Sequence, residues 1–326
     1  MGEKETKQAA ATRVCGFEVS LRPLRIAWLV LPWVLVGLLV VQIYPSRLST
    51  MELNSAVSQL TAQLGQIKKE QAMPAIVLKR YRGSICYIYA VYTMEWPAKV
   101  VARPLTRHTK VSGTGFLVAN NLVATNRHVA EPWFEDEDDQ AQIKAGAKPK
   151  LEKLVAFFPG MMDPLKLGDI RVSMDQDLAV AKLIEGPVPI SIQPLPLADV
   201  QSNPGDPVIV VGYPLGISTM LAKTPANLYK RLASTKDTIT VASELAANAM
   251  IRPSATCGHL GDVVDNKLVY DAPTAQGGSG GPVFNSKGEV IAVNSAYIDG
   301  FNGGTIGISS LSLRPLIAAA SHRRPR

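Results

Sequence analysis

A single serine embedded among glycines is a residue whose type and surroundings could do chemistry. The segment QGGSGGPVF spans residues 276–284, so Ser279 lies between two pairs of glycines and Pro282 leads into an apolar run. A serine hydroxyl becomes a strong nucleophile only when a base accepts its proton and a third group orients that base. The segment is therefore either a flexible turn or the site of a nucleophile, depending on which residues accompany it.

His128 is the histidine whose surroundings suit a base. It lies in SGTGFLVANNLVATNRHVAEP, shortly after an apolar hairpin that ends at Thr125. The junction between a strand and a loop is where rigid scaffolds commonly hold functional side chains. The other histidines are less suited, because His108 and His259 lie in polar or turn segments and His322 lies in the basic C-terminal tail.

Asp177 is the candidate for the group that orients the base. The segment SMDQDLAVAKL offers Asp175 and Asp177, and Asp177 directly precedes an apolar strand. A carboxylate there can lie at the mouth of a core and be buried against an imidazole, whereas Asp175 lies two residues further out. Either residue could instead be a turn residue that caps the start of the strand.

The order His128, Asp177, Ser279 resembles that of the trypsin-like serine peptidases. Within that superfamily the chain looks most like the bacterial HtrA-type branch, over roughly residues 80–312. Four blocks match in order, namely GTGFLV…LVATNRHVA, DQDLAVAKL, GDPVIVVGYPLG and YDAPTAQGGSGGPVFNSKGEVIAVNSA. GGSGG alone is a weak signal, whereas four blocks in the correct order are a strong one.

The resemblance implies an all-β fold of two six-stranded β-barrels, with His128 and Asp177 on the first barrel and Ser279 on the second. His128 would take the proton of Ser279 as it attacks a peptide carbonyl, and Asp177 would hold the imidazole. The backbone N–H groups of Gly277 and Ser279 would form the oxyanion hole. Protein or peptide substrates are expected, with no cofactor.

The same resemblance predicts residues that line the first substrate pocket. Pro273 would lie at its bottom, Asn294, Ser295 and Ala296 along one wall, and residues 306–310 along another. No acid stands where it would select lysine or arginine, so a small or medium apolar residue is expected before the scissile bond.

Gly278 departs from the pattern, because trypsin-like digestive enzymes carry Asp there and HtrA-like proteins usually carry Asn. Without a carboxylate, activation by an ion pair with a new N-terminus is not expected. A glycine could also leave the oxyanion loop mobile, so that the hole forms only when substrate or a partner binds. About a dozen residues follow the last expected strand, which leaves no room for the PDZ domain that HtrA-type chains commonly append.

The elements that must position these residues read as short strands separated by turns. Residues 115–125 predict a hairpin with Asn120 and Asn121 at its tip, and 263–270 and 283–291 each carry turn residues between apolar runs. Further strands are expected at 84–93, 177–183, 207–214, 237–243 and 288–296. Helical periodicity is weak, and residues 226–234 are the best short candidate.

The N-terminal part predicts a membrane anchor. Residues 26–43 contain no charge, and a helix of that length is about as long as the hydrocarbon core is thick. More Lys and Arg precede this span than follow it, which predicts a cytoplasmic N-terminus and a periplasmic or extracellular domain. The bacterial resemblance implies a single pass through the inner membrane, with lipid contacted by residues 26–44.

A connector follows the span. Leu53, Val57, Leu60, Leu64 and Ile67 form a heptad-like apolar seam, and Pro74 marks its expected end. The helical stalk would either pack on its own domain or self-associate into a homo-oligomer. The expected organisation is a tail at 1–25, the span at 26–44, the stalk at 45–74, the peptidase domain at 75–315 and a basic tail at 316–326.

Composition excludes several other classes. The chain is 47% hydrophobic and 19% charged, so it can bury a core, and its net charge of +7 is scattered rather than gathered into a nucleic-acid-binding stripe. The acidic run at 135–139 lacks the spacing of a calcium loop and reads as a solvated loop, and no metal is expected. Cys86 and Cys257 would either form a disulfide or remain separate buried thiols.

Two competing interpretations remain. GGSGG also fits the nucleophile turn of α/β-hydrolases, and Asp299 and His322 follow Ser279 in the order that fold needs. That turn must lead into a helix, however, whereas Pro282 and the hairpin after it disfavour one. The other alternative is a catalytically silent scaffold that binds peptides or partners at the membrane.

Overall fold

The computed structural model describes residues 22–96, 108–185, 192–297 and 304–321, with the side chains of 22–29, 44–49 and 297 left out. The chain divides into two compact units, residues 1–67 and 68–326. All of the expected active-site residues belong to the second unit.

The first half of that unit is a closed antiparallel barrel whose strands follow the order β1-β2-β3-β6-β5-β4. Its strands are β1 (Ile85–Glu95), β2 (His108–Ala119), β3 (Leu122–Thr125), β4 (Lys148–Phe157), β5 (Leu165–Val172) and β6 (Ala179–Leu183). Two helices interrupt them, α2 (Arg127–Ala130) and α3 (Glu137–Lys144). A closed barrel has no unpaired edge strand, and alternate residues of each strand point into its interior.

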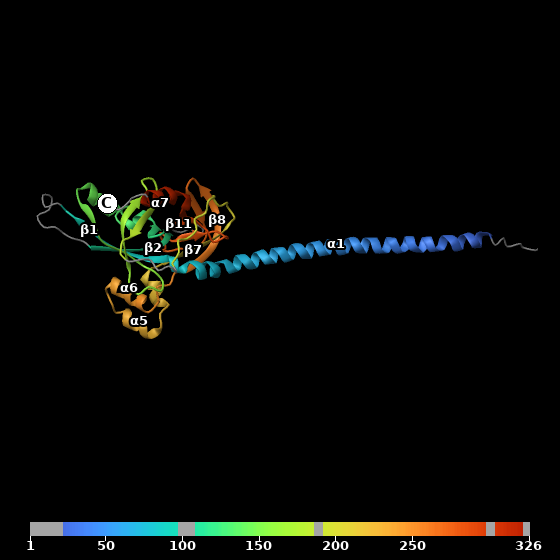
Figure 1. Ribbon diagram of the computed structural model, residues 1–326, viewed down its shortest axis with the longest axis horizontal. Coiled ribbons are helices and arrows are strands. Elements are labelled where there is room, and N and C mark those ends of the chain that lie inside the picture. The colour runs from blue at the N-terminus through green and yellow to red at the C-terminus, as the bar shows by residue number, and fades with distance from the viewer. Residues whose placement is uncertain (1–21, 97–107, 186–191, 298–303, 322–326) are drawn as a thin grey trace, which may run out of the picture. The chain divides into compact units, whose positions relative to one another are not determined.

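The second half repeats this architecture in the order β10-β11-β12-β9-β8-β7. Its strands are β7 (Pro207–Gly212), β8 (Ser254–Val264), β9 (Lys267–Tyr270), β10 (Pro282–Phe284), β11 (Val290–Tyr297) and β12 (Thr305–Ser309). Figure 1 labels β7, β8 and β11 of this barrel, and the C-terminal helix α7 (Leu313–Ser321) contacts β3, β5 and β6 of the first barrel. The expectation of two six-stranded barrels is thereby confirmed.

The hairpins form where the sequence places turn residues. β2 and β3 meet at Asn120 and Asn121, and Asn121 adopts a left-handed φ of 63°. β8 and β9 meet in the same way at Asp265, with φ of 53°. Asn and Asp tolerate this conformation better than other non-glycine residues, which explains why these apolar runs reverse there.

Each barrel has its own core, and a third cluster joins them. Ile88, Leu117 and Phe158 are fully or almost fully buried inside the first barrel. The shared cluster includes Tyr87 from the first barrel and Tyr213 from the second, whose rings meet edge to face at 5.7 Å between centroids. This contact fixes the two barrels against each other, which an active site built from both requires.

Residues 237–243 were expected to form a strand and instead lie mostly in a helix, α6 (Thr238–Ala247). The side chain of Asp237 caps the helix by accepting from the N–H of Thr240, and Val241, Ala242, Leu245 and Ala246 are buried along one face. Helix capping and packing thus override the β-propensity of the Thr, Ile and Val residues.

Helix α6 belongs to an insertion of three helices between β7 and β8. It is preceded by α4 (Ile217–Ala222) and by α5 (Ala226–Leu232), and α5 confirms the helix expected there. In Figure 1, α5 and α6 lie together at one side of the barrel strands.

The N-terminal helix α1 (Arg22–Tyr81) does not end at Pro74 as expected but continues to Tyr81. Met73 and Val77 are buried in the shared cluster, and the Tyr81 ring stacks on Phe284 at 5.5 Å. This packing compensates for the N–H that proline lacks.

The first unit does not confirm a packed stalk or a span. Leu53, Val57, Leu60, Leu64 and Ile67 are 48–63% exposed in the single chain. Among the residues whose side chains are described, no helix has the length and hydropathy to cross a membrane. The span expected at 26–44 lies partly outside those residues.

Other expectations also change at the ends of the fold. Helix α7 reaches Ser321, so the basic tail does not begin at 316, and residues 322–326 lie outside the described chain. Cys86 and Cys257 are both free thiols, Cys86 buried in the first barrel and Cys257 exposed on β8. The two cysteines therefore do not form a disulfide.

Candidate active site

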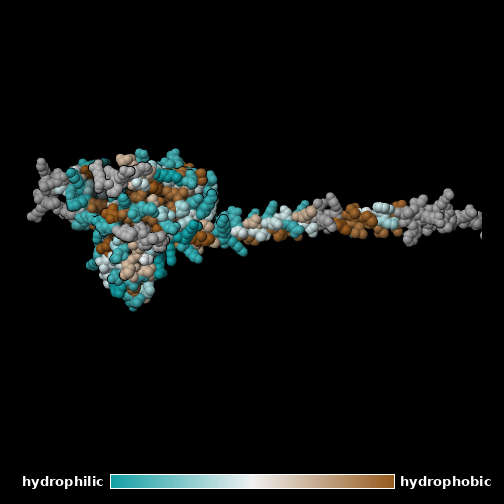
Figure 2. Space-filling view, in the orientation of Figure 1, coloured by the Kyte–Doolittle hydropathy of each residue, from teal (hydrophilic) through white to brown (hydrophobic). Residues whose placement is uncertain are grey.

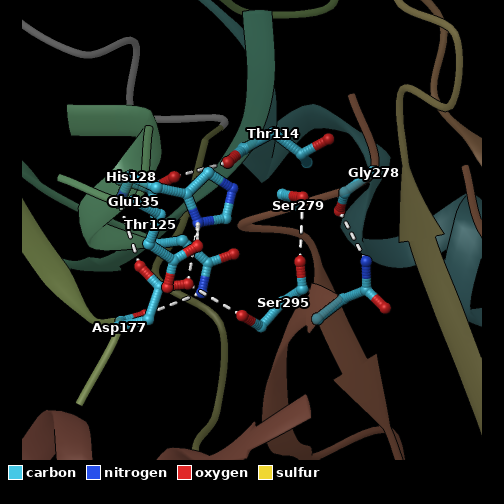
Figure 3. A network of polar contacts seen from close by, with 10 residues as sticks. Thr114, Thr125, His128, Glu135, Asp177, Gly278, Ser279 and Ser295 are labelled. Atoms are coloured by element: carbon cyan, nitrogen blue, oxygen red, sulfur yellow. Dashed lines mark hydrogen bonds and ion pairs between the residues drawn. The ribbon is translucent and has the colours of Figure 1, made fainter. Parts of the chain in front are cut away.

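The three residues singled out by the sequence come from three different elements and meet between the barrels. His128 lies in the single-turn helix α2 directly after β3, Asp177 just before β6, and Ser279 in the turn before β10. Figure 3 shows their side chains in one network. His108 and His259 are exposed elsewhere, and Asp299 and His322 lie outside the described residues.

Asp177 is the centre of the network, because its carboxylate accepts three hydrogen bonds. Oδ1 accepts from the backbone N–H of His128 at 2.9 Å, and Oδ2 lies 2.8 Å from Nδ1 of the same residue. Oδ2 also accepts from the hydroxyl of Ser295 at 2.7 Å, across the boundary between the barrels. Asp177 is 9% exposed, so these bonds compensate for the burial of its charge.

The backbone of Asp177 is fixed as well. The side-chain amide of Asn126, a fully buried residue at the start of α2, donates to the carbonyl oxygen of Asp177 at 2.8 Å. Asn126 and the backbone N–H of His128 are thus both tied to Asp177, and the imidazole has little freedom to leave the carboxylate.

Opposing effects act on His128. Burial alone would lower its pKa, but the hydrogen bond and charge of Asp177, together with the charge of Glu135, raise it above the usual 6.5. The raised pKa means that the surroundings favour the protonated imidazole, which is the form that a base takes once it has accepted a proton.

Four acids of the run at 135–139 are exposed as expected, but part of the run begins helix α3 instead of forming a loop, and Asp139 is buried. Oε2 of Glu135 lies 3.4 Å from Nδ1 of His128. Asp136 caps α3 by accepting from the N–H of Asp139, and Asp139 is buried against the hydroxyl of Tyr92. No spacing rule in the sequence indicated that Glu135 would reach the histidine.

Ser279 itself has a different partner from the one expected. Its hydroxyl donates to the backbone oxygen of Ser295 at 3.0 Å (Figure 3). Among the hydrogen bonds of the described residues, none joins Ser279 to His128. A serine side chain changes partner by rotating about one single bond between staggered positions.

The peptide planes on either side of the Ser279 turn are held from behind. The carbonyl of Gln276 accepts from the N–H of Leu215 at 2.6 Å, and the carbonyl of Gly278 accepts from the amide of Asn294 at 3.0 Å. In a trans peptide the N–H points opposite to the carbonyl. The N–H groups of Gly277 and Ser279 therefore point away from these donors, and neither finds an acceptor among the described residues.

Gly278 has a steric role in the turn. A Cβ there would lie 2.4 Å from Oγ1 of Thr274 and 3.0 Å from the oxygen of Ala275. Its N–H also donates to Ala275 at 2.8 Å. Gly277 has a φ of 91°, a conformation that favours glycine. Both glycines are needed for the tight shape of the turn.

Thr114 on β2 joins the first barrel to this turn. Its N–H donates to the oxygen of Ser279 at 2.8 Å, and its hydroxyl donates to the oxygen of Gly277 at 2.7 Å. The hydroxyl also accepts from the N–H of Tyr213 at 3.0 Å. No local pattern in the sequence singles out Thr114, because its role depends on contacts between distant segments.

The expected pocket residues do not all face a cavity. Asn294 is fully buried, and its amide oxygen accepts from the hydroxyl of Tyr270 at 2.8 Å, so it supports the turn instead of lining a pocket. Pro273 accepts a hydrogen bond from Thr256 through its backbone. Ser295 and Ala296 do line a cavity, which also borders Asp177.

The donor atoms of His128, Glu135 and Asp177 lie within 4.8 Å of one another, and such a group could hold a metal ion. The carboxylate of Asp177 is already occupied by three hydrogen bonds, however. A cation there would have to displace them, which makes the group a poor resident metal site.

Comparison with known proteins identifies the domain. Residues 113–293 match the model of the trypsin-like peptidase domain. A probable periplasmic serine endoprotease, DegP-like, of Chlamydia pneumoniae is 30% identical over 203 residues, which is 61% of this chain and 31% of that protein. The chain thus spans about a third of the length of the curated relative that it matches.

Two solved structures align with most of the chain. The Rv3671c protease of M. tuberculosis, in its active form, aligns with a TM-score of 0.46 at 16% identity, over 77% of this chain and 86% of that one. A serine endoprotease of Yersinia pestis aligns with a TM-score of 0.44 at 17% identity, over 74% and 64%. Since the family match alone covers more than half of the residues, the chain belongs to the trypsin-like peptidase family.

Proposed function

We propose that the chain is a serine endopeptidase in which Ser279 is the nucleophile, His128 the general base and acid, and Asp177 the group that orients the imidazole. The observation that carries the proposal is the joint presence of the His128–Asp177 pair and a serine turn whose two outward N–H groups meet no acceptor in the described parts of the chain. Both parts are needed for acyl transfer, because one activates the nucleophile and the other stabilises the oxyanion.

The reaction would proceed in two steps. The hydroxyl of Ser279 turns from Ser295 to His128, and its oxygen bonds to the peptide carbonyl carbon while the proton passes to the imidazole. His128 then protonates the leaving amine as the C–N bond breaks, which leaves an ester on Ser279. Water hydrolyses that ester with His128 again as the base. The N–H groups of Gly277 and Ser279 hold the oxyanion in both steps.

The setting of the enzyme also belongs to the proposal. The DegP-like relative is named as periplasmic, which favours a periplasmic domain engaged in protein quality control or regulated proteolysis. The described residues 30–43 carry no charge, and many of their apolar side chains are exposed, as the brown stretch of the helix in Figure 2 shows. A bilayer would bury them, with the inner membrane as the expected site.

The exposed seam from Leu53 to Ile67 supports self-association of the stalk. Its spacing matches the core positions of a coiled coil. The stalks of two copies anchored side by side in one membrane would bury the seam against each other. Two heptads are marginal on their own, so the proposed association depends on the anchor that concentrates the chains.

A catalytically silent scaffold is the second candidate. The observation in its favour is that the hydroxyl of Ser279 donates to Ser295 rather than to His128. A scaffold needs no activated serine, whereas a peptidase does. A measurement of serine reactivity therefore distinguishes the two candidate functions.

A fluorophosphonate probe should label the wild-type protein at Ser279, because only an activated serine reacts with it. The variant Ser279→Ala should lose the label and lose peptide hydrolysis by at least about 10³-fold. Labelling is measured by intact mass. Equal background labelling of both proteins would favour the silent scaffold.

The substitution Asn294→Asp should lower kcat while leaving KM nearly unchanged. A carboxylate cannot donate to the oxygen of Gly278, so the peptide that presents the N–H of Ser279 loses its support. Loss of one oxyanion donor costs about 10²–10³ in turnover, and we expect a decrease of up to about 10² here. Steady-state kinetics on a peptide substrate measures it.

The control for this experiment is Asn227→Asp, an exposed position at the start of α5 where aspartate keeps the acceptor that Leu228 uses. Thermal melts of both variants show whether the fold is retained. A folded Asn294→Asp protein with wild-type kcat, or one changed only in KM, would contradict the role assigned to Asn294.

Activity should rise with pH through the pKa of His128, because the imidazole must be neutral to accept a proton. Glu135 raises that pKa, so Glu135→Gln should move the acid limb of kcat/KM to lower pH. The control is Glu137→Gln, an exposed acid on α3. An acid limb that stays in place, or moves to higher pH, would show that Glu135 does not act on the histidine.

Alkaline carbonate should leave the full-length chain in the membrane pellet when it is expressed in a Gram-negative host. A variant lacking residues 26–44 should appear in the soluble fraction and still react with the fluorophosphonate probe. Extraction of the full-length chain by carbonate would rule out the anchor.

A further inference from the structure

One cavity borders the proposed catalytic residues and has no role in the mechanism above. It has a volume of about 580 Å³, within the range typical of ligand pockets. It lies between the segment before β6, the β8–β9 hairpin and strand β12, and Asp177 and Ser295 form part of its wall. A substrate side chain next to the reacting bond is therefore within reach of it.

One part of the cavity is apolar. Met174 and Val264 are 81% and 52% exposed, although apolar side chains of this size are usually buried. Ile306 and Ile308 of β12 line the same cavity. An occupant with an aliphatic portion would remove this apolar surface from water.

The other part carries an excess of negative charge. Glu135, Asp175, Asp177 and Asp265 line the cavity, whereas Lys267 is its one basic lining residue. Within the described parts of the chain, Asp175 and Asp265 form no ion pair, and Glu135 contacts only the imidazole that Asp177 already holds. Three carboxylates are thus left without a cation of their own.

The pKa of Glu135 is raised in these surroundings. Burial raises its pKa, and the charge of Asp177 raises it further, against the opposing effect of His128. A cation in the cavity would relieve the repulsion between these acids. Its attraction would also offset part of the loss of hydration that burial imposes on Glu135.

We propose that this cavity binds a lysine or arginine side chain of the substrate, with the aliphatic stem on Met174, Val264 and β12 and the charged group among Glu135, Asp175 and Asp265. The inference rests on the proposed function and adds a basic subsite to it. A long basic side chain combines an apolar stem with a charged end, which is the combination that the two parts of the cavity require. An aspartate or glutamate side chain would meet like charge, and a purely apolar one would leave the acids unpaired.

The subsite differs from the pocket expected before the scissile bond. The cavity shares Ser295, Ala296, Ile306 and Ile308 with the walls expected for that pocket, but Pro273, the residue expected at its bottom, does not line the cavity. A substrate of this peptidase would thus carry a basic residue at a position other than the one that the Pro273 pocket receives.

A position-scanning library of fluorogenic peptides tests the inference on the full-length protein. At one position, Lys and Arg should raise kcat/KM about fivefold over Gln, the scale of two or three partly exposed ion pairs, and the preference should weaken as salt increases. In the double variant Asp175→Asn with Asp265→Asn the preference should disappear, while turnover of a neutral peptide stays unchanged. No preference for Lys or Arg at any position, or the same preference in the double variant, would overturn the proposal.

The matched control is Asp163→Asn with Asp262→Asn, which removes two exposed charges that do not line the cavity and should retain the preference. If the double variant does not fold, Lys267→Gln serves instead, and it should strengthen the preference because it removes the one competing cation. An unchanged preference in Lys267→Gln would then count against the proposal.

Binding measured on Ser279→Ala separates this inference from the proposed function. An arginine peptide selected from the library should bind this variant about fivefold more tightly than its glutamine counterpart, as measured by fluorescence anisotropy. Equal binding of the two peptides would refute the basic subsite even if the wild type hydrolyses both. Tighter binding of the arginine peptide, without hydrolysis or probe labelling of the wild type, would refute the peptidase and leave the subsite standing.

Discussion

The carboxylate of Asp177 is the constraint on which the rest of the site depends. It accepts two hydrogen bonds from His128 on the first barrel and one from Ser295 on the second. A buried carboxylate is tolerated only when such donors surround it, so the same three bonds that stabilise the charge also position the imidazole and join the barrels. Moving one barrel away from the other would break the bond from Ser295 and would remove one of the three donors from the buried carboxylate.

A second constraint acts on the serine turn from the opposite side. The backbone of Leu215, the hydroxyl of Thr114 and the amide of Asn294 each hold one carbonyl of the turn. These donors lie in three separate segments, and Thr114 belongs to the first barrel. The turn is therefore held from three segments in the shape that points the N–H groups of Gly277 and Ser279 away from these donors.

Much of this could be predicted from the sequence because the signals are local. Alternating apolar residues and the Asn120–Asn121 and Asp265 turns predict their hairpins, and the order of His128, Asp177 and Ser279 predicts which residues meet. Helix α6 was missed because Thr, Ile and Val favour strands, whereas its cap at Asp237 and its buried face favour a helix. Pro74 was taken as a boundary because the packing of Met73 and Val77 that continues the helix is tertiary.

Thr114 and the supporting role of Asn294 could not have been read from local pattern, since each bonds to the serine turn from another segment of the chain. Glu135 is close to His128 in the sequence, but no spacing rule indicates that their side chains meet. The most direct test of the account is a crystal structure with a peptide boronate, which imitates the tetrahedral intermediate. We predict a bond from Oγ of Ser279 to boron, with one boronate oxygen about 2.7–3.1 Å from the N–H groups of both Gly277 and Ser279. An inhibitor that forms no bond to Ser279, or an oxygen that meets neither N–H, would contradict it.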